Sequence, residues 1–258
     1  MTGQASTQHQ LVFLGGLHRS GTTLLAQMLA EHPQVSGLTN TGVPHDEGQH
    51  LHNVVEPATA YGGPGHFGND PRSHLTEADI AKVAVPGERM FAAWQPYFDL
   101  EKRILVEKSP PNLLRFRFLQ AAFPDAACVA IVRHPVAVAY ATEFWAKRPI
   151  GALLEHWLHA HEVFERDRPH IKRLLWMRYE DIVADPAAAL IQLDEFLGIG
   201  AHCTTEPVRN DTNRRYFKRF RHARGVPAAL KIAPLVLRYE SRLAALGYGY
   251  SLRDRGDR

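Results

Sequence analysis

The chain has 258 residues, of which 45% are hydrophobic and 22% charged, and its formal net charge at pH 7 is +3. This composition is that of an ordinary globular protein, and so weak a positive charge argues against a dedicated nucleic-acid-binding protein. Two cysteines, Cys128 and Cys203, do not imply a disulfide framework, so we expect a reducing compartment.

The length and the terminal segments set further expectations. Because domains usually contain about 100–200 residues, we expect one domain over residues 1–258, with 1–9 and 252–258 as disordered tails. The polar start has no signal-peptide pattern, and no apolar run approaches the roughly 18 residues that cross a membrane. We therefore expect a cytoplasmic protein with no membrane span.

Short apolar runs alternate with helical patterns along the chain. The predicted strands are LVFL (11–14), RILVEK (103–108), CVAIVR (128–133) and LLWMRY (174–179). The predicted helices cover about 21–31, a stretch that opens at Thr76, 112–123, a stretch after Pro135, and 186–199. Strands that alternate with helices are typical of a parallel sheet with helices on both faces. The sequence therefore predicts an α/β fold.

A glycine-bearing turn from Gly16 to Thr23 follows the first predicted strand. It fits the phosphate-binding pattern G-x-x-x-x-G-K-[ST] at every position except one, because Thr22 replaces the lysine. Backbone N–H groups at the start of the next helix point at an anion bound in such a turn. Arg19 lies inside the turn, where its guanidinium can bind an anionic group through two parallel hydrogen bonds.

Cationic and hydrogen-bonding residues also follow the other predicted strands. They are Lys108 and Ser109, Arg133 and His134, and Arg178 and Tyr179. In an open parallel sheet, ligands bind beyond the carboxyl ends of the strands. P-loop kinases need the lysine that is replaced here and an acid that holds Mg²⁺. The pattern favours an anion that is neutralised by fixed cations and hydroxyls, such as a sulfuryl group.

Several segments, in the family order, resemble the sulfotransferases that use 3′-phosphoadenosine 5′-phosphosulfate (PAPS). They are HRSGTTLL (18–25), EKSPPNLL (107–114), AIVRHPVAVAYATEFW (130–145) and MRYEDIVADPAAALIQLDEFLGI (177–199). The chain is most similar to the tyrosylprotein-type and bacterial members with R-S-G-T-T loops. The resemblance covers residues 11 to about 200 and implies the P-loop sulfotransferase fold, PAPS as co-substrate, adenosine 3′,5′-bisphosphate (PAP) as product, and no metal.

The resemblance also implies roles on the donor side. The 5′-phosphosulfate would be held by Arg19, Ser20, Gly21, Thr22 and Thr23. Arg133 would bind the 3′-phosphate, and Tyr179 would lie beside the adenine.

The second contact to the 3′-phosphate departs from the family pattern. The family has a serine eight residues after the arginine, where this chain has Ala141, so the adjacent Thr142 is the candidate hydroxyl. The basic segment NRRYFKRF (213–220) either supplies another contact to the 3′-phosphate or is a solvated helix face.

The segment TGVPHDEGQHLHNVVEP (41–57) contains the candidate general bases His45, Asp46, Glu47, His50 and His52. Glu47 is the first choice, because the tyrosylprotein-type relatives use a carboxylate, followed by His50, Asp46 and His45. Lys108 would reach the transferring sulfuryl group or form a structural ion pair. His45 and His50 do not match the H-E-x-x-H spacing of a zinc site.

The segment 61–74, rich in glycine and proline, is expected to form a mobile loop over the acceptor site. The sequence as a whole predicts a PAPS-dependent sulfotransferase that modifies a hydroxyl on a small molecule, glycan or peptide. Two other functions stay open: a P-loop small-molecule kinase and a non-catalytic nucleotide-binding module. The acceptor and the oligomeric state are not fixed by the sequence.

Overall fold

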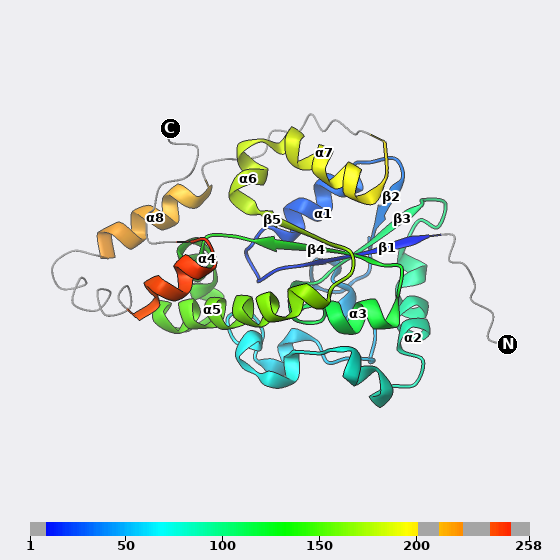
Figure 1. Ribbon diagram of the computed structural model, residues 1–258, viewed down its shortest axis with the longest axis horizontal. Helices are drawn as coiled ribbons and strands as arrows, with labels where there is room; N and C mark the ends of the chain where they lie inside the picture. Colours follow the sequence, from blue (N-terminus) through cyan, green and yellow to red (C-terminus); the bar gives the residue numbers. More distant parts are fainter. Residues whose placement is uncertain (1–8, 201–211, 224–237, 249–258) are drawn as a thin grey trace.

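The computed structural model describes residues 9–200, 212–223 and 238–248 (Figure 1). Cys203 and the expected tails, apart from His9, lie outside these ranges. The centre is a parallel sheet in the order β2-β3-β1-β4-β5. Its strands are β1 (Gln10–Gly15), β2 (Val35–Gly37), β3 (Ile104–Lys108), β4 (Ala127–Val132) and β5 (Leu174–Arg178). The sheet confirms the predicted fold class, and β2 is a short additional strand.

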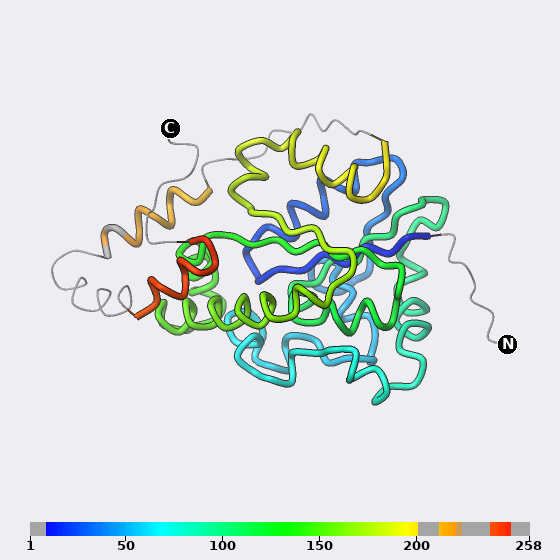
Figure 2. The backbone as a smooth tube through the Cα atoms, viewed as in Figure 1, coloured from blue at the N-terminus to red at the C-terminus, as the bar shows by residue number. Residues whose placement is uncertain are grey.

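Helices cover both faces of the sheet (Figures 1 and 2). One face carries α1 (Thr22–Ala30), α6 (Tyr179–Ala184) and α7 (Pro186–Leu197). The other carries α2 (Pro86–Trp94), α3 (Phe116–Ala122), α4 (Pro135–Ala146) and α5 (Ile150–Asp167), and α8 (Thr212–Ala223) packs beside α4. In the described ranges, the helices do not combine the length and the apolar character that a membrane span requires.

The buried side chains form one core on each face. Val12 and Leu14 of β1 pack with α1, α6 and α7, whereas Phe13 packs on the side of α3 and α5. Because both faces of a doubly covered parallel sheet are buried, its strands read as continuous apolar runs, as β1 does.

Some elements differ from the prediction. The helix expected over 112–123 begins at Phe116, because Pro110 and Pro111 open a 3-10 turn that extends to Leu114. The capping box at Thr76 is present, since the Asp79 carboxylate accepts from the Thr76 N–H at 2.8 Å. The helix that it opens is a 3-10 helix (Glu77–Lys82). Helices α2, α5 and α6 have no counterpart in the prediction.

Candidate active site

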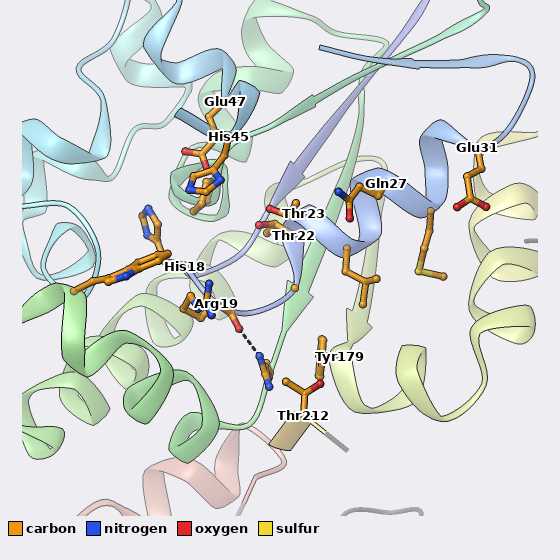
Figure 3. A pocket seen from close by; sticks show the side chains of 16 residues that line it. His18, Arg19, Thr22, Thr23, Gln27, Glu31, His45, Glu47, Tyr179 and Thr212 are labelled. Carbon is orange, nitrogen blue, oxygen red and sulfur yellow. Dashed lines mark hydrogen bonds between the residues drawn. The ribbon is translucent and has the colours of Figure 1, made fainter. Parts of the chain in front are cut away.

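A cavity of about 600 Å³ opens at the carboxyl ends of the central strands (Figure 3). Glu47 and His45 lie at one end, Tyr179 and Thr212 at another, and Thr22 and Thr23 lie between them. The cavity brings together most of the residues that the sequence selected: Arg19, Gly21, Thr22, Thr23, His45, Glu47, Arg133 and Tyr179.

The glycine-bearing turn leads from β1 into α1 through two left-handed residues, Arg19 (φ 69°) and Gly21 (φ 105°). A Cβ on Gly21 would lie 2.6 Å from the Tyr179 ring, so a glycine is required there. Gly21 gives α1 no side-chain cap, which leaves backbone N–H groups of its first turn available to an anion. Ser20 is 0% exposed, and its hydroxyl has no hydrogen-bond partner within the described ranges. Ser20 does not line the cavity, and its contact with the 5′-phosphosulfate stays a prediction.

Arg133 follows β4 and is held from several directions. Its Nε donates to Asn213 Oδ1 at 2.8 Å, its Nη1 donates to the Arg19 carbonyl at 2.8 Å, and its Cζ lies 4.1 Å from the centroid of the Tyr179 ring. The side chain is 5% exposed, and burial lowers the pKa of its guanidinium. Nη2 has no partner among the residues described. An anion at Nη2 would offset the cost of burying this charge.

The basic segment 213–220 forms part of α8 and reaches this arginine through Asn213. The Asn213 amide also donates to Glu180 Oε1 at 2.8 Å, so Asn213 joins the strand ends to α8. Arg214, Arg215 and Lys218 are exposed on the same helix.

Thr142 lies outside the lining of the main cavity. Its buried hydroxyl, which has no partner in the part of the chain described, lines a second and smaller cavity with Leu17, His18 and His156. Ala141 is half-buried. The contact of Thr142 with the 3′-phosphate stays a prediction.

Glu47 and Lys108 meet on the other side of the cavity. Lys108 Nζ lies 3.3 Å from Glu47 Oε1 and also donates to the His45 carbonyl at 2.9 Å. Glu47 Oε2 accepts from Gln49 Nε2 at 2.5 Å, and His50 Nε2 lies 3.9 Å away. Both members of the ion pair are buried. The structure thus brings together the predicted base and the predicted lysine, from segments far apart in the sequence.

A buried carboxylate, Glu107, fixes the segment that carries Glu47. It accepts from the Gly48 N–H at 3.0 Å, the Ser109 hydroxyl at 2.6 Å and the Asn112 amide at 2.6 Å. Burial raises the pKa of Glu107. A Cβ on Gly48 would lie 2.6 Å from Glu107 and 2.7 Å from the Trp94 indole nitrogen, so only glycine allows this approach.

The other predicted bases are placed differently. Asp46 accepts from the Thr41 N–H at 2.9 Å and from the Thr41 hydroxyl at 2.5 Å, and these hydrogen bonds lower its pKa. His45 lines the cavity from a left-handed backbone position (φ 56°). His50 contacts Glu47 and does not line the cavity.

The family model for sulfotransferases matches residues 11–202. The chain belongs to the sulfotransferase family. Nodulation protein NoeE of Sinorhizobium fredii (strain NBRC 101917 / NGR234) is 28% identical over 152 residues, which cover 54% of this chain and 32% of that protein. The chain therefore matches about a third of the length of this curated relative. The family membership confirms the resemblance seen in the sequence.

Solved structures of sulfotransferases are also similar. The sulfotransferase domain from the Synechococcus PCC 7002 olefin synthase is 22% identical with a TM-score of 0.47, covering 74% of this chain and 73% of that one. Sulfotransferase STF1 from Mycobacterium tuberculosis H37Rv is 18% identical with a TM-score of 0.48, covering 82% of this chain and 71% of that one.

One cavity residue of this sulfotransferase family member, His18, was missed by the sequence analysis. Burial, together with the charge of Lys108, lowers the pKa of His18 to about 3, so its ring is neutral near pH 7. The signal that could have found it is its place in the turn, directly before Arg19.

The segment 61–74 contains short 3-10 turns that pack behind the glycine-bearing turn. Phe67 is buried between the rings of His18 and His156, at centroid distances of 5.5 and 5.3 Å. The Gly68 N–H donates to His156 Nε2 at 3.1 Å. Through these contacts the segment packs against His18 and His156. Its expected mobility stays a prediction. Over the described ranges, His, Cys, Asp and Glu form no group of three that could hold a metal ion.

Proposed function

We propose that this sulfotransferase family member transfers a sulfuryl group from PAPS to an acceptor hydroxyl and releases PAP. The observation that carries the proposal is that two arginines reach one cavity from separate places: Arg19 in the glycine-bearing turn, and Arg133 with its partly unpaired guanidinium. A donor with phosphates at both the 5′ and the 3′ positions fits such a pair, and a nucleotide without a 3′-phosphate leaves Arg133 buried without an anion.

The donor side would use the groups that the turn leaves free. The Ser20 hydroxyl, the N–H groups at the start of α1 and the Arg19 guanidinium would hold the 5′-phosphosulfate, with Thr22 and Thr23 at the first turn of the helix. Tyr179, whose ring packs against Arg133, would lie beside the adenine.

The acceptor side would handle the proton. As the acceptor oxygen forms its bond to sulfur, its proton passes to a carboxylate oxygen of Glu47, and the bond between sulfur and the 5′-phosphate oxygen breaks. Lys108 lies 3.3 Å from Glu47 and does not itself line the cavity. It would keep this carboxylate paired with a positive charge and would supply that charge toward the leaving phosphate. A positioned base of this kind contributes about 10²–10⁴-fold to the rate.

Glu47 is preferred among the candidate bases because of its surroundings. The Asp46 carboxylate accepts hydrogen bonds from Thr41, and His50 lies 3.9 Å from Glu47 without lining the cavity. Glu47 lines the cavity and is held by Lys108 and Gln49. The acceptor would be a hydroxyl of a small molecule, a glycan or a peptide.

The kinase alternative needs a carboxylate that can hold Mg²⁺ at a strand end. The residue after β4 is Arg133, and the Glu107 carboxylate at the end of β3 is already enclosed by three hydrogen bonds. These groups favour a donor whose charge is met by arginine and lysine.

Transfer of label from [³⁵S]PAPS tests the proposal. The purified protein would be incubated with a panel of sugars, phenols, tyrosine peptides and lipid alcohols, and Glu47→Gln would be the matched control. We expect labelled product and stoichiometric PAP with at least one acceptor class. Phosphoryl transfer from ATP and Mg²⁺ to the same panel would support the kinase instead. Tight PAP binding with no transfer to any acceptor would support a non-catalytic nucleotide-binding module.

A further inference from the structure

The guanidinium of Arg19 packs on an aromatic ring beside the cavity. Its Cζ lies 4.8 Å from the centroid of the Trp145 ring. Across the described ranges, its side chain donates no hydrogen bond to a carbonyl or side chain and forms no ion pair. The backbone carbonyl of Arg19 accepts a hydrogen bond from Arg133 Nη1. Trp145 lies near the end of α4 and lines the same cavity.

Arg133 shows the contrasting arrangement. Two of its nitrogens donate to protein oxygens, and its face packs on Tyr179. Its position is therefore fixed by hydrogen bonds, which leave Nη2 for a ligand. Arg19 is restrained through its face alone, which leaves its in-plane N–H groups free.

This difference has a physical consequence. A cation over an aromatic face is attracted by the ring without using its N–H donors and without neutralising its charge. A carboxylate partner would occupy N–H donors of the guanidinium and would neutralise its charge. A long arginine side chain that is not restrained must be ordered when a ligand binds, which weakens affinity. An aromatic partner removes part of that cost and keeps every donor available.

We propose that Trp145 is a positioning residue that holds the Arg19 guanidinium ready for the 5′-phosphosulfate of the donor. This inference rests on the proposed donor. Trp145 is 49% exposed, so the contact is at the mouth of the cavity, where water competes for the arginine. Its neighbour Phe144 is 88% exposed and does not line the cavity, so Phe144 provides a matched control on the same helix.

Calorimetric titration with PAP tests the proposal without any acceptor. We expect Trp145→Ala to weaken PAP binding about 2- to 5-fold, the range for a solvent-exposed cation–π contact. Trp145→Phe should recover part of the loss, and Phe144→Ala should bind as the wild type does. Adenosine 3′-monophosphate, which has no 5′-phosphate, should bind Trp145→Ala and the wild type equally.

A double variant separates positioning from a general effect on the fold. In an Arg19→Ala background, Trp145→Ala should cause little further loss of PAP affinity. Unchanged PAP binding by Trp145→Ala, an equal loss for adenosine 3′-monophosphate, or a full additional loss in the Arg19→Ala background would each overturn the proposal. Failure of the proposed donor has a different signature, because the wild type would then bind PAP no better than 5′-AMP, and both proposals would fall.

Discussion

The two sides of the cavity are positioned by different means. On the proposed donor side, β1, the glycine-bearing turn and α1 follow one another in the chain, so local backbone structure places the N–H groups at the start of α1. On the acceptor side, Glu47 is carried by 3-10 turns whose place depends on the Glu107 carboxylate, 59 residues beyond Gly48. A site built locally can be recognised from a short motif, whereas a site built by long-range hydrogen bonds cannot.

Glu47→Gln changes the acceptor side alone and has the largest expected effect. A glutamine cannot accept the proton, so turnover should fall about 10²–10⁴-fold. The donor-binding groups are untouched, so PAP affinity should stay close to that of the wild type. Steady-state kinetics and calorimetry on the same preparation measure the two quantities.

Two variants test the competing bases. Asp46→Asn and His50→Asn should retain most of the turnover, because neither side chain lines the cavity. Near-normal turnover in Glu47→Gln, combined with its loss in His50→Asn, would show that the histidine is the base.

Glu107→Gln weakens the hydrogen bonds that fix the segment carrying Glu47. One carboxylate oxygen becomes an amide donor and faces another donor, either at Asn112 or at Gly48 and Ser109. We expect the free energy of unfolding to fall by about 1–3 kcal/mol, the cost of an unsatisfied buried polar group. Turnover should fall as well, while PAP affinity is preserved.

Chemical unfolding of Glu101→Gln provides the matched control, because Glu101 is exposed and the same amide replaces the same carboxylate. Its free energy of unfolding should stay within about 0.5 kcal/mol of the wild type. If Glu107→Gln reduced PAP affinity as much as turnover, the separation of the two sides would be wrong.

The packing that supports Arg133 should make the free energy of unfolding depend on pH. His161 stacks on Trp157 at 4.0 Å, and the Trp157 indole donates to the Arg133 carbonyl at 3.0 Å. Burial lowers the pKa of His161 from 6.5 to about 4. Between these values the unfolded state binds the proton and the folded state does not, so the stability from neutral His161 is complete above pH 6.5 and is lost as the pH falls toward 4.

Urea unfolding at pH 7 and pH 5 measures this effect. The wild type should lose about 2 kcal/mol more than His161→Phe between the two values. An identical pH dependence in the two proteins would show that His161 is not kept neutral by the fold.

Among the variants in this series, Asn213→Ala has the smallest expected effect. That effect is on binding of the 3′-phosphate of the donor. Loss of the hydrogen bond to Arg133 Nε should weaken PAP binding by about 1 kcal/mol, which is roughly fivefold. Binding of 5′-AMP should not change. Lys218→Ala, an exposed position on the same helix, should bind PAP as the wild type does, and an equal loss in both variants would indicate a general charge effect.

Much of the fold was predictable from the sequence because its signals are local. The run 11–14 and the turn from Gly16 to Thr23 identify a strand, a phosphate loop and a helix start within a few residues. The run 35–38 contains only a three-residue strand, and α5 follows a proline at Pro149 with no polar cap, so neither gives a strong local signal.

The position of a side chain at this edge of the sheet was predictable where the residue lies at the end of a strand, as for Arg133 and Lys108; their roles stay predictions. The position was not predictable where it depends on distant partners. Nothing near Trp145 in the sequence indicates that Arg19 packs on it. The hydrogen bonds from the Gly48 N–H to Glu107 and from the Gln49 N–H to Ser109 join segments about 60 residues apart. Thr142 lines a second cavity, and the strand-end pattern does not determine which face of α4 its side chain occupies.

Discrimination between nucleotides tests the central claim, that one cavity holds both phosphates of a 3′-phosphorylated donor. Wild-type protein would be titrated calorimetrically with PAP, with 5′-AMP, and with ATP in the presence of Mg²⁺. We expect PAP to bind about 10- to 100-fold more tightly than 5′-AMP, the range for hydrogen bonds to a charged group, and more tightly than ATP. Equal affinity for PAP and 5′-AMP would contradict the account, because Arg133 would then have no part in binding the donor.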